Sequence, residues 1–163
     1  MLKQFLPQLQ TTFLKALNDP NRTVRLKSST ALSYLILIHQ KADTLFTDLH
    51  NTLKSTEDSS IRWVPLCKSG SPDVLNLKMS HVNFRETTLH ALRGIIGPAG
   101  DKVSPLLKKQ IHHTLIGLLS NPDDVTRTVA AGCLGSLCKW LPPDLLDVTI
   151  IDHILSKFRC VYS

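Results

Sequence analysis

A pattern of turn and helix recurs three times in this chain, and such a repeat restricts the fold more than any single residue does. In the first copy Val24 and Arg25 follow a polar turn, and a small residue and a leucine come seven and eight residues after Val24. The third copy places Thr126 and Arg127 after a similar turn, and the small residue Cys133 and Leu134 again follow seven and eight residues after Thr126. Self-similarity of this kind predicts a solenoid of helical hairpins, which bury their apolar sides by stacking on one another.

The middle copy is interrupted. It begins with Ile61 and Arg62, and the pattern then stops until Glu86. If residues 63–85 are set aside, a small residue and Leu92 return at the expected spacing after Ile61. The repeat arginines are then 37 and 42 residues apart, which suits a helical-hairpin repeat of about 40 residues. We therefore interpret residues 63–85 as an insertion, in a loop or disordered, within the array.

Apolar residues at three- and four-residue spacing predict a series of amphipathic helices. The first covers about residues 3–18, the third ends near Ser55, and the next runs from Glu86 to Ile96. A last amphipathic segment, 145–155, has no partner helix, so we expect a fragment of a longer array. Five residues are expected on the buried side of the second helix: Val24, Ala31, Leu32, Leu35 and Ile38.

Each second helix of a hairpin is expected to begin with a capping side chain. An Asn or Asp stands four residues before every repeat arginine, and these residue types accept hydrogen bonds from the free amides of a first helical turn. The three expected caps are Asn21, Asp58 and Asp123.

Composition narrows the class of protein. A hydrophobic fraction of 42% over 163 residues indicates a folded chain. No stretch reaches the length of an apolar membrane span, and residues 1–4 lack the features of a signal peptide, so we expect a cytoplasmic protein without membrane contact. The cysteines show neither CxxC spacing nor a Cys/His ligand pattern, which disfavours zinc and disulfides.

The net charge of +6 raises the question of nucleic-acid binding. Residues 63–85 and 156–163 each carry a net charge of +2, so only +2 remains for the repeats. Several clustered cations are needed to neutralise phosphates together. A phosphate-binding stripe is therefore disfavoured, although an array that contacts RNA or ribosomes stays open as an alternative.

The motif that runs from Asp19 through Arg25 to Leu35 resembles the HEAT repeat, in which a turn acid and the following arginine form a ladder along the stack. Arg25, Arg62 and Arg127 match the ladder arginine. The acid matches fully only at Asp19, since Thr56 and Asn121 stand at the equivalent places.

Three longer strings resemble the C-terminal HEAT region of the general control non-derepressible protein 1 family: residues 5–13, 21–27 and 131–135. The resemblance covers about residues 3–62 and 86–155. It implies a scaffold that takes part in activating the kinase of initiation factor 2 alpha at ribosomes during amino-acid starvation. It also implies that this part of the array lies at or near the segment that holds the RWD domain of the kinase.

The insertion has a further interpretation at the level of the gene. Residues 62–64 can be encoded by a sequence like a splice donor, and residues 83–85 can end a pyrimidine-rich stretch on AG. We therefore hypothesise a retained intron at 63–85, with the irregular tail 156–163 as a second case. Reads that join codons 62 and 86 in spliced transcripts would support it.

Two groups that resemble chemical sites have simpler interpretations. His112 and His113 are adjacent, so on a helix they point about 100° apart and do not chelate one ion together. Asp123 and Asp124 stand at a helix start, where acids stabilise free amides and the helix dipole. The sequence offers no nucleophile with a base, so an enzyme is the disfavoured rival class.

The sequence therefore predicts an all-α HEAT-repeat α-solenoid of about three repeats plus one extra helix, over residues 1–155. It predicts a non-catalytic scaffold with no cofactor, metal or small-molecule ligand. The structural repeat positions are Asp19, Arg25, Arg62 and Arg127. Charged residues outside the repeat pattern are candidates for contact with an acidic partner surface: Arg22, Lys27, Lys54, Arg93 and Lys102.

Overall fold

The computed structural model describes residues 2–38, 42–63, 72–143 and 146, with the backbone alone for 2–3, 56–63 and 72–83. The described part is helical throughout apart from short turns. Its elements are η1 (Leu2–Phe5), α1 (Leu6–Ala16), α2 (Arg22–Ile38), α3 (Ala42–Trp63), α4 (Pro72–Ala99), η3 (Gly100–Lys102), α5 (Pro105–Leu118) and α6 (Asp124–Cys138).

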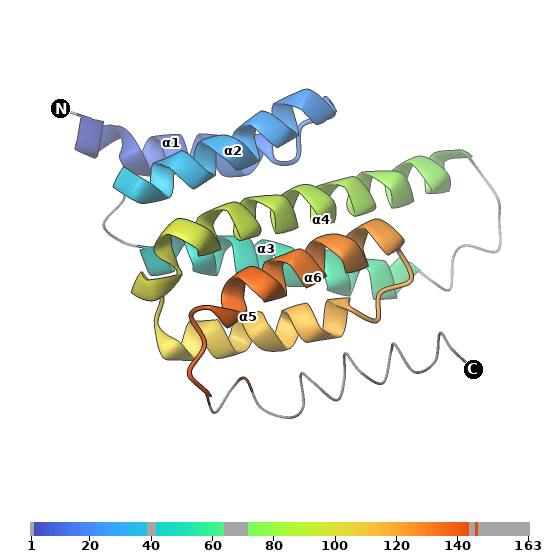
Figure 1. Cartoon of the computed structure of the whole chain (residues 1–163). Helices are drawn as coiled ribbons and strands as arrows, with labels where there is room; N and C mark the ends of the chain where they lie inside the picture. The colour runs from blue at the N-terminus through green and yellow to red at the C-terminus, as the bar shows by residue number, and fades with distance from the viewer. Residues whose placement is uncertain (1, 39–41, 64–71, 144–145, 147–163) are drawn as a thin grey trace.

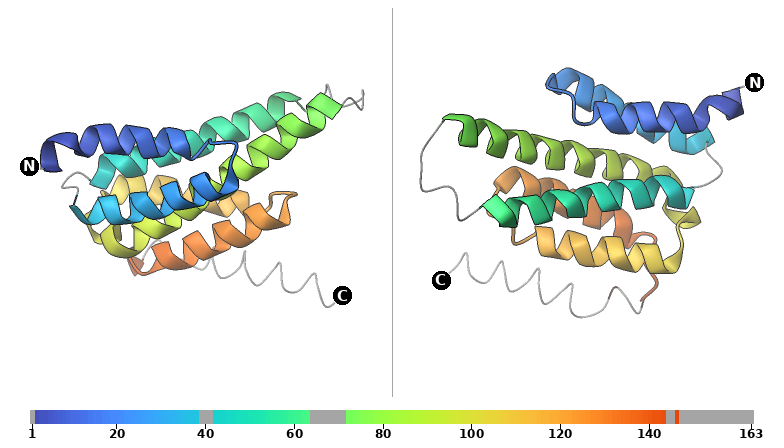
Figure 2. Two further views of the ribbon diagram at one scale, coloured as in Figure 1. Left: turned by 90° about the horizontal axis from the view of Figure 1, so that it is seen from above. Right: turned by 180° about the vertical axis from the view of Figure 1, so that it is seen from behind.

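The helices form three antiparallel hairpins that stack in two layers (Figures 1 and 2). α1 packs on α2, α3 on α4 and α5 on α6, so each hairpin contributes one helix to each layer. In the front layer of Figure 1, α4 lies between α2 and α6 and contacts both. In the rear layer α3 contacts α5. The prediction of an all-α stack of hairpins is confirmed.

The core follows from the apolar stripes of these helices. The leucine of each copy points inward, so Leu32, Leu92 and Leu134 are all buried. The small residue is buried in the second and third copies, at Ala91 and Cys133, but only partly buried in the first, at Ala31. α4 has neighbours on three sides, and its Leu89, Leu92, Ile95 and Ile96 have no exposed surface. The large apolar side chains of α3 are buried as completely: Leu45, Phe46, Leu49 and Leu53. Gly94 permits the close approach of α4 to α2, because a Cβ there would lie 2.3 Å from the Ser33 hydroxyl oxygen.

Two expected caps are confirmed. Asn21 precedes α2, and its Oδ1 accepts a hydrogen bond of 2.9 Å from the Thr23 amide. Asp123 precedes α6, and its Oδ2 accepts from the amide of Thr126 at 2.8 Å and from its hydroxyl at 2.6 Å. Both caps satisfy amides that have no carbonyl partner within the helix.

The third expected cap is wrong. The expected helix end near Ser55 is not observed, because α3 continues to Trp63, and Asp58 therefore lies within a helix rather than before one. α4 begins at Pro72 and runs through Gly97 and Pro98 to Ala99. Residues 72–85 are thus helical rather than a loop, while 64–71 lie outside the described residues. Whether 63–85 interrupts an ancestral repeat stays a prediction.

The prediction that Val24 and Ile38 are buried in α2 is also wrong, since Val24 is 38% exposed and Ile38 is 53% exposed. Both lie at the border of the apolar stripe, and no described helix covers that side of the first hairpin. The expected last helix at 145–155 and the tail at 156–163 lie outside the described residues. None of the described helices is long and apolar enough to span a membrane.

Candidate binding surface

The turn of the first hairpin is built around Asp19 and Arg25. The Asp19 carboxylate accepts a hydrogen bond of 2.8 Å from the Asn21 amide. Arg25 is 7% exposed, and its Nη1 donates to the carbonyl oxygens of Asp19 at 2.9 Å and of Pro20 at 3.0 Å. The arginine therefore stabilises the backbone of its own turn.

The third hairpin repeats this turn with different residues. Asn121 accepts a hydrogen bond of 3.0 Å from the Asp123 amide, as Asp19 does in the first turn. Arg127 Nη1 donates to the carbonyl oxygens of Asn121 at 2.6 Å and of Pro122 at 3.0 Å, and its guanidinium also pairs with Asp124. Because an amide oxygen accepts as a carboxylate oxygen does, Asn121 preserves the turn although it lacks the acid of the HEAT pattern.

In the middle hairpin the position of the repeat arginine belongs to Arg85 rather than Arg62. Arg62 lies near the end of α3, in the other layer. Arg85 precedes Leu92 by seven residues, as Arg25 precedes Leu32 and Arg127 precedes Leu134, and it is 4% exposed. The sequence interpretation selected Arg62 because it follows a polar stretch like those of the other copies, but packing of α4 selects Arg85.

The positive charge of Arg85 also acts across the boundary between successive hairpins. Partial burial of the Asp123 carboxyl would raise its pKa, but the hydrogen bonds from Thr126 and the nearby positive charge of Arg85 outweigh burial and lower that pKa. The middle arginine therefore acts electrostatically on the cap of the third hairpin.

The candidate cation Arg22 lies at the start of α2 and faces α4. Its side chain is 68% exposed, and its Nη2 lies 3.5 Å from Glu86 Oε1. The same carboxylate oxygen lies 3.8 Å from His90 Nε2, one turn further along α4. Glu86, only 14% exposed, is thus held between an arginine of one hairpin and a histidine of the next.

Arg93 continues this row on α4 and reaches over α6. Glu86, His90 and Arg93 are spaced by four and three residues and share one helix face. A Cβ at Gly132 would lie 2.9 Å from Arg93 Nη1, so the absent side chain leaves room for the guanidinium on α6. Arg93 is exposed, and within the described part of the chain its guanidinium has no hydrogen bond or ion pair.

The other candidate cations do not join this row. Lys27 is exposed on α2, about 140° around the helix from Arg22, which faces α4. Lys54 is exposed on α3 in the opposite layer, and Lys102 is exposed in η3. The structure therefore brings together Arg22 and Arg93 but not Lys27, Lys54 and Lys102.

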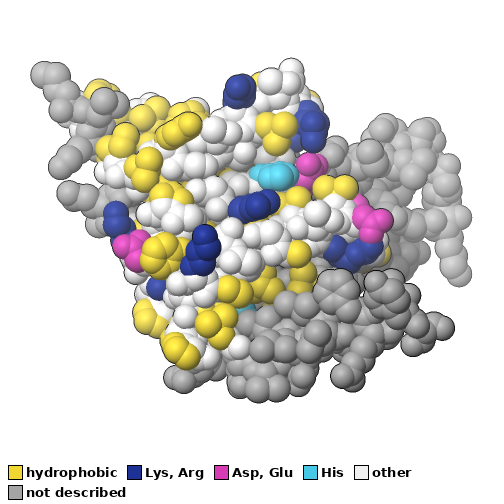
Figure 3. All heavy atoms as spheres, in the orientation of Figure 1, with side chains coloured by type: hydrophobic (Ala, Val, Ile, Leu, Met, Phe, Trp, Pro, Cys, Tyr) yellow, Lys and Arg dark blue, Asp and Glu magenta, His cyan; other side chains and the backbone are white. Residues whose placement is uncertain are grey.

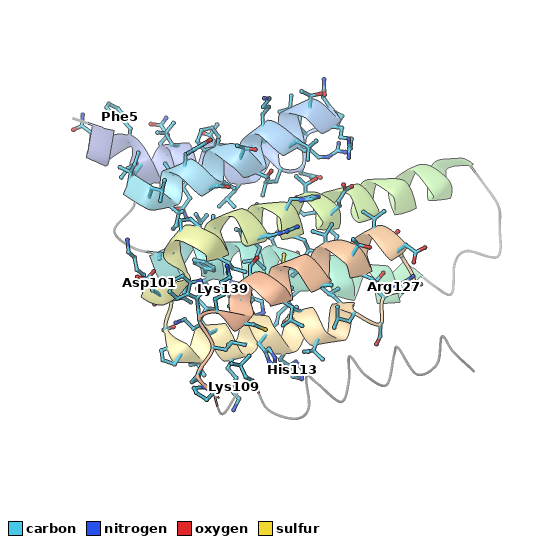
Figure 4. The ribbon with its side chains drawn as sticks, viewed as in Figure 1. Phe5, Asp101, Lys109, His113, Arg127 and Lys139 are labelled. Atoms are coloured by element: carbon cyan, nitrogen blue, oxygen red, sulfur yellow. The ribbon has the colours of Figure 1, made fainter. Side chains whose placement is uncertain are left out.

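Sequence reasoning missed Lys139 and the central residues Glu86 and His90. Lys139 is exposed at the carboxyl end of α6, and Figure 4 labels it there. It comes seven residues, or about two turns, after Gly132 and therefore lies on nearly the same face of the helix. We define the basic surface as Arg22, His90, Arg93 and Lys139. The spacing of Glu86, His90 and Arg93 was visible in the sequence, but only the packing of α4 against α2 and α6 joins it to Arg22 and Lys139.

The cysteine and histidine side chains that could take part in chemistry are explained by packing and hydrogen bonding. Burial raises the pKa of the Cys133 thiol to about 12, and its Sγ donates to the Leu89 carbonyl. Burial, and to a lesser extent the neighbouring His113, lower the pKa of His112. His50 forms a buried hydrogen bond of 2.9 Å with Thr114 between α3 and α5. The described residues include no group of three or more His, Cys, Asp or Glu side chains that could hold a metal.

Helical hairpins stacked in two layers, with an arginine closing the turn of the first and of the third hairpin, are typical of the HEAT-repeat class of α-solenoids. Comparison with known families agrees: the family described as "Stalled ribosome sensor GCN1-like, HEAT repeats" matches residues 77–160. The chain belongs to this GCN1-like HEAT-repeat family.

Three relatives illustrate the similarity. The chain is 41% identical over 155 residues to Stalled ribosome sensor GCN1 of Mus musculus and, with the same identity and length, to that of Homo sapiens; each alignment covers 95% of this chain. It is 29% identical over 170 residues to eIF-2-alpha kinase activator GCN1 of Saccharomyces cerevisiae, again over 95% of this chain. The chain spans only 5% of the two mammalian relatives and 6% of the yeast relative. No solved structure matches the chain.

Proposed function

We propose that this chain is a non-catalytic HEAT-repeat scaffold segment that binds protein partners and takes part in activating the eIF2α kinase at cytoplasmic ribosomes during amino-acid starvation. The bound element of the kinase is its RWD domain. The observation that carries the proposal is membership of the GCN1-like family over most of the chain. The yeast relative is named as an activator of this kinase, and the mammalian relatives as sensors of stalled ribosomes.

The geometry is compatible with a scaffold. Three hairpins hold their exposed helix faces in fixed relation because α4 packs against both α2 and α6. Charged side chains on such faces steer association and add specificity. Figure 3 shows Lys and Arg side chains distributed over the face formed by the front-layer helices.

The test is a pull-down of the full chain with the RWD domain of the kinase. Arg22→Ala is expected to weaken binding more than it weakens folding, because Arg22 is 68% exposed. Arg25→Ala is expected to weaken both, because it removes the hydrogen bonds that close the first turn. Circular dichroism of each variant separates the two effects. If neither the wild-type chain nor a longer chain retained the RWD domain, this role would be excluded.

A second candidate is direct contact with the ribosome, supported by the name of the mammalian relatives. Binding that neutralises several phosphates weakens steeply with added salt, whereas a protein contact has a shallow slope. Co-sedimentation of the chain with ribosomes over a salt series therefore distinguishes the two. A steep slope together with no RWD binding would favour ribosomal RNA as the partner.

A further inference from the structure

The face formed by α2, α4 and α6 carries the basic surface across all three hairpins. Arg22 belongs to the first hairpin, His90 and Arg93 to the second, and Lys139 to the third. α2 contains no acidic residue, and α6 contains Asp124 alone, at its first position. The surface exists only when the hairpins are stacked.

Glu86 is the carboxylate that lies within this row. Its Oε1 is near both Arg22 Nη2, at 3.5 Å, and His90 Nε2, at 3.8 Å. Arg93 lies on the same face of α4, and no described carboxylate lies within ion-pair distance of it or of Lys139. One end of the row therefore holds an internal carboxylate, and the other end has unpaired cations.

We propose that the basic surface binds an acidic segment of a protein partner, and that Glu86 competes with the carboxylates of that segment for Arg22. This inference gives the chemistry of the partner in the scaffold function proposed above, and it rests on that function. Arg93 and Lys139 make the first contacts, because they have no internal partner. Arg22 contributes when a carboxylate of the partner replaces Glu86.

A short acidic segment fits this surface better than a nucleic acid does. The four basic residues are spread over three hairpins rather than clustered as phosphate binding requires. Isolated carboxylates at intervals match separated cations, whereas a continuous phosphate chain carries a charge at every unit and most of these would have no partner on this surface.

The test measures fluorescence anisotropy of a labelled peptide of alternating glutamate and serine with the full chain. Arg93→Gln and Lys139→Gln are each expected to weaken binding about three- to fivefold, as removal of one exposed charge pair does. Lys109→Gln on α5 removes the same charge from the other layer and is expected to leave the affinity for the peptide unchanged. Equal loss with Lys109→Gln would show attraction by net charge alone and overturn the proposal.

The sharper test is a variant that improves binding. Glu86→Gln keeps the size of the side chain and removes its charge, so Arg22 is released and affinity is expected to rise about threefold. Asp43→Asn in α3 is the matched control, because it removes one negative charge in the other layer while its Oδ1 can still accept from the Ser104 amide. An unchanged or reduced affinity of Glu86→Gln would overturn the competition.

Single-stranded polyuridine is the alternative probe. Tighter binding of polyuridine than of the peptide, lost on Arg93→Gln, would make the surface an RNA site and overturn the proposal. Absence of peptide binding by the wild type would overturn it too. Because the peptide assay contains no RWD domain, peptide binding by the basic surface together with a failed RWD pull-down would contradict the proposed function alone.

Discussion

The outer hairpins and the middle hairpin pack alike, but the repeat arginine stands at a different place in their second helices. In α2 and α6 the repeat arginine comes three residues after the first residue of the helix, behind a capped turn. In α4 the equivalent Arg85 comes thirteen residues after Pro72, in the interior of a longer helix. All three arginines nevertheless precede a buried leucine by the same seven residues. The register of a hairpin in the stack is therefore set by the buried stripe of its second helix, not by its turn.

The largest effect is expected at the leucine of the middle copy. Leu92→Ala should lower the free energy of unfolding by about 2–5 kcal/mol, because the cavity forms where α4 is packed by α2, α3 and α6. Leu134→Ala, 3% exposed in the outer helix α6, should cost less, because fewer helices surround it. Urea unfolding of both variants measures the difference. Equal losses would contradict the central place of α4 in the core.

A smaller effect is expected at the turn arginines. Arg25→Ala should lower the free energy of unfolding by about 2–3 kcal/mol, because it removes buried hydrogen bonds from a charged donor to two carbonyl oxygens. Arg127→Ala removes the same kind of bonds, but its side chain is 37% exposed and water can replace it, so its loss should be about half. Thermal unfolding followed by circular dichroism measures both. A larger loss for Arg127→Ala would show that burial does not decide the strength of these turns.

Removal of residues 63–85 tests whether the middle hairpin is an altered outer hairpin. The deletion joins Arg62 to Glu86, so Arg62 should take the register of Arg85 and Asp58 should become a helix cap. The shortened chain should unfold at a higher temperature, with a gain of about 1–2 kcal/mol from the restored cap and its hydrogen bonds. Differential scanning calorimetry measures the thermal midpoints of the shortened and the full chain. An unchanged or lower thermal midpoint would argue that the long α4 is a stable form of the hairpin.

The smallest effect distinguishes the two outer caps. Asp123→Ala and Asn21→Ala should each cost about 1 kcal/mol at neutral pH. Hydrogen bonds from Thr126 and the charge of Arg85 lower the pKa of Asp123 below 3.8 in the folded chain. Its charged form therefore adds stability at pH values above 3.8, and this contribution is lost as the pH falls through the lowered pKa. The cost of Asp123→Ala should shrink in acid, whereas that of Asn21→Ala should not, as chemical denaturation at several pH values can show.

Much of the fold could be predicted from the sequence because its signals are local. The spacing of apolar residues gave the helices of the outer hairpins, and Asn21 and Asp123 cap helices as their residue types favour. The prediction failed at Asp58 and Arg62, whose local pattern resembles a turn followed by a helix. There α3 continues as a helix to Trp63, so the same residue types do not start a new helix.

The candidate site was less predictable, because it depends on residues that are distant in the chain. Sequence reasoning selected Arg22 and Arg93 but grouped them with Lys27 and Lys54, which face other directions or belong to the other layer. It also passed over Glu86 and Lys139. The ion pair between Arg22 and Glu86 joins residues of different hairpins, and no spacing in the sequence indicates it.

By itself the sequence determined the class of fold and the family. Both depend on patterns of residues close together in the chain, and these patterns do not depend on where each helix begins or ends. The tertiary structure decided which arginine serves the middle hairpin and which charges share a surface. The physical reason is that α4 must bury Leu89, Leu92 and Ile95 between α2 and α6, and this burial fixes its register along the stack. Once that register is fixed, Arg85 lies near the third cap and Glu86, His90 and Arg93 lie in the exposed row between Arg22 and Lys139.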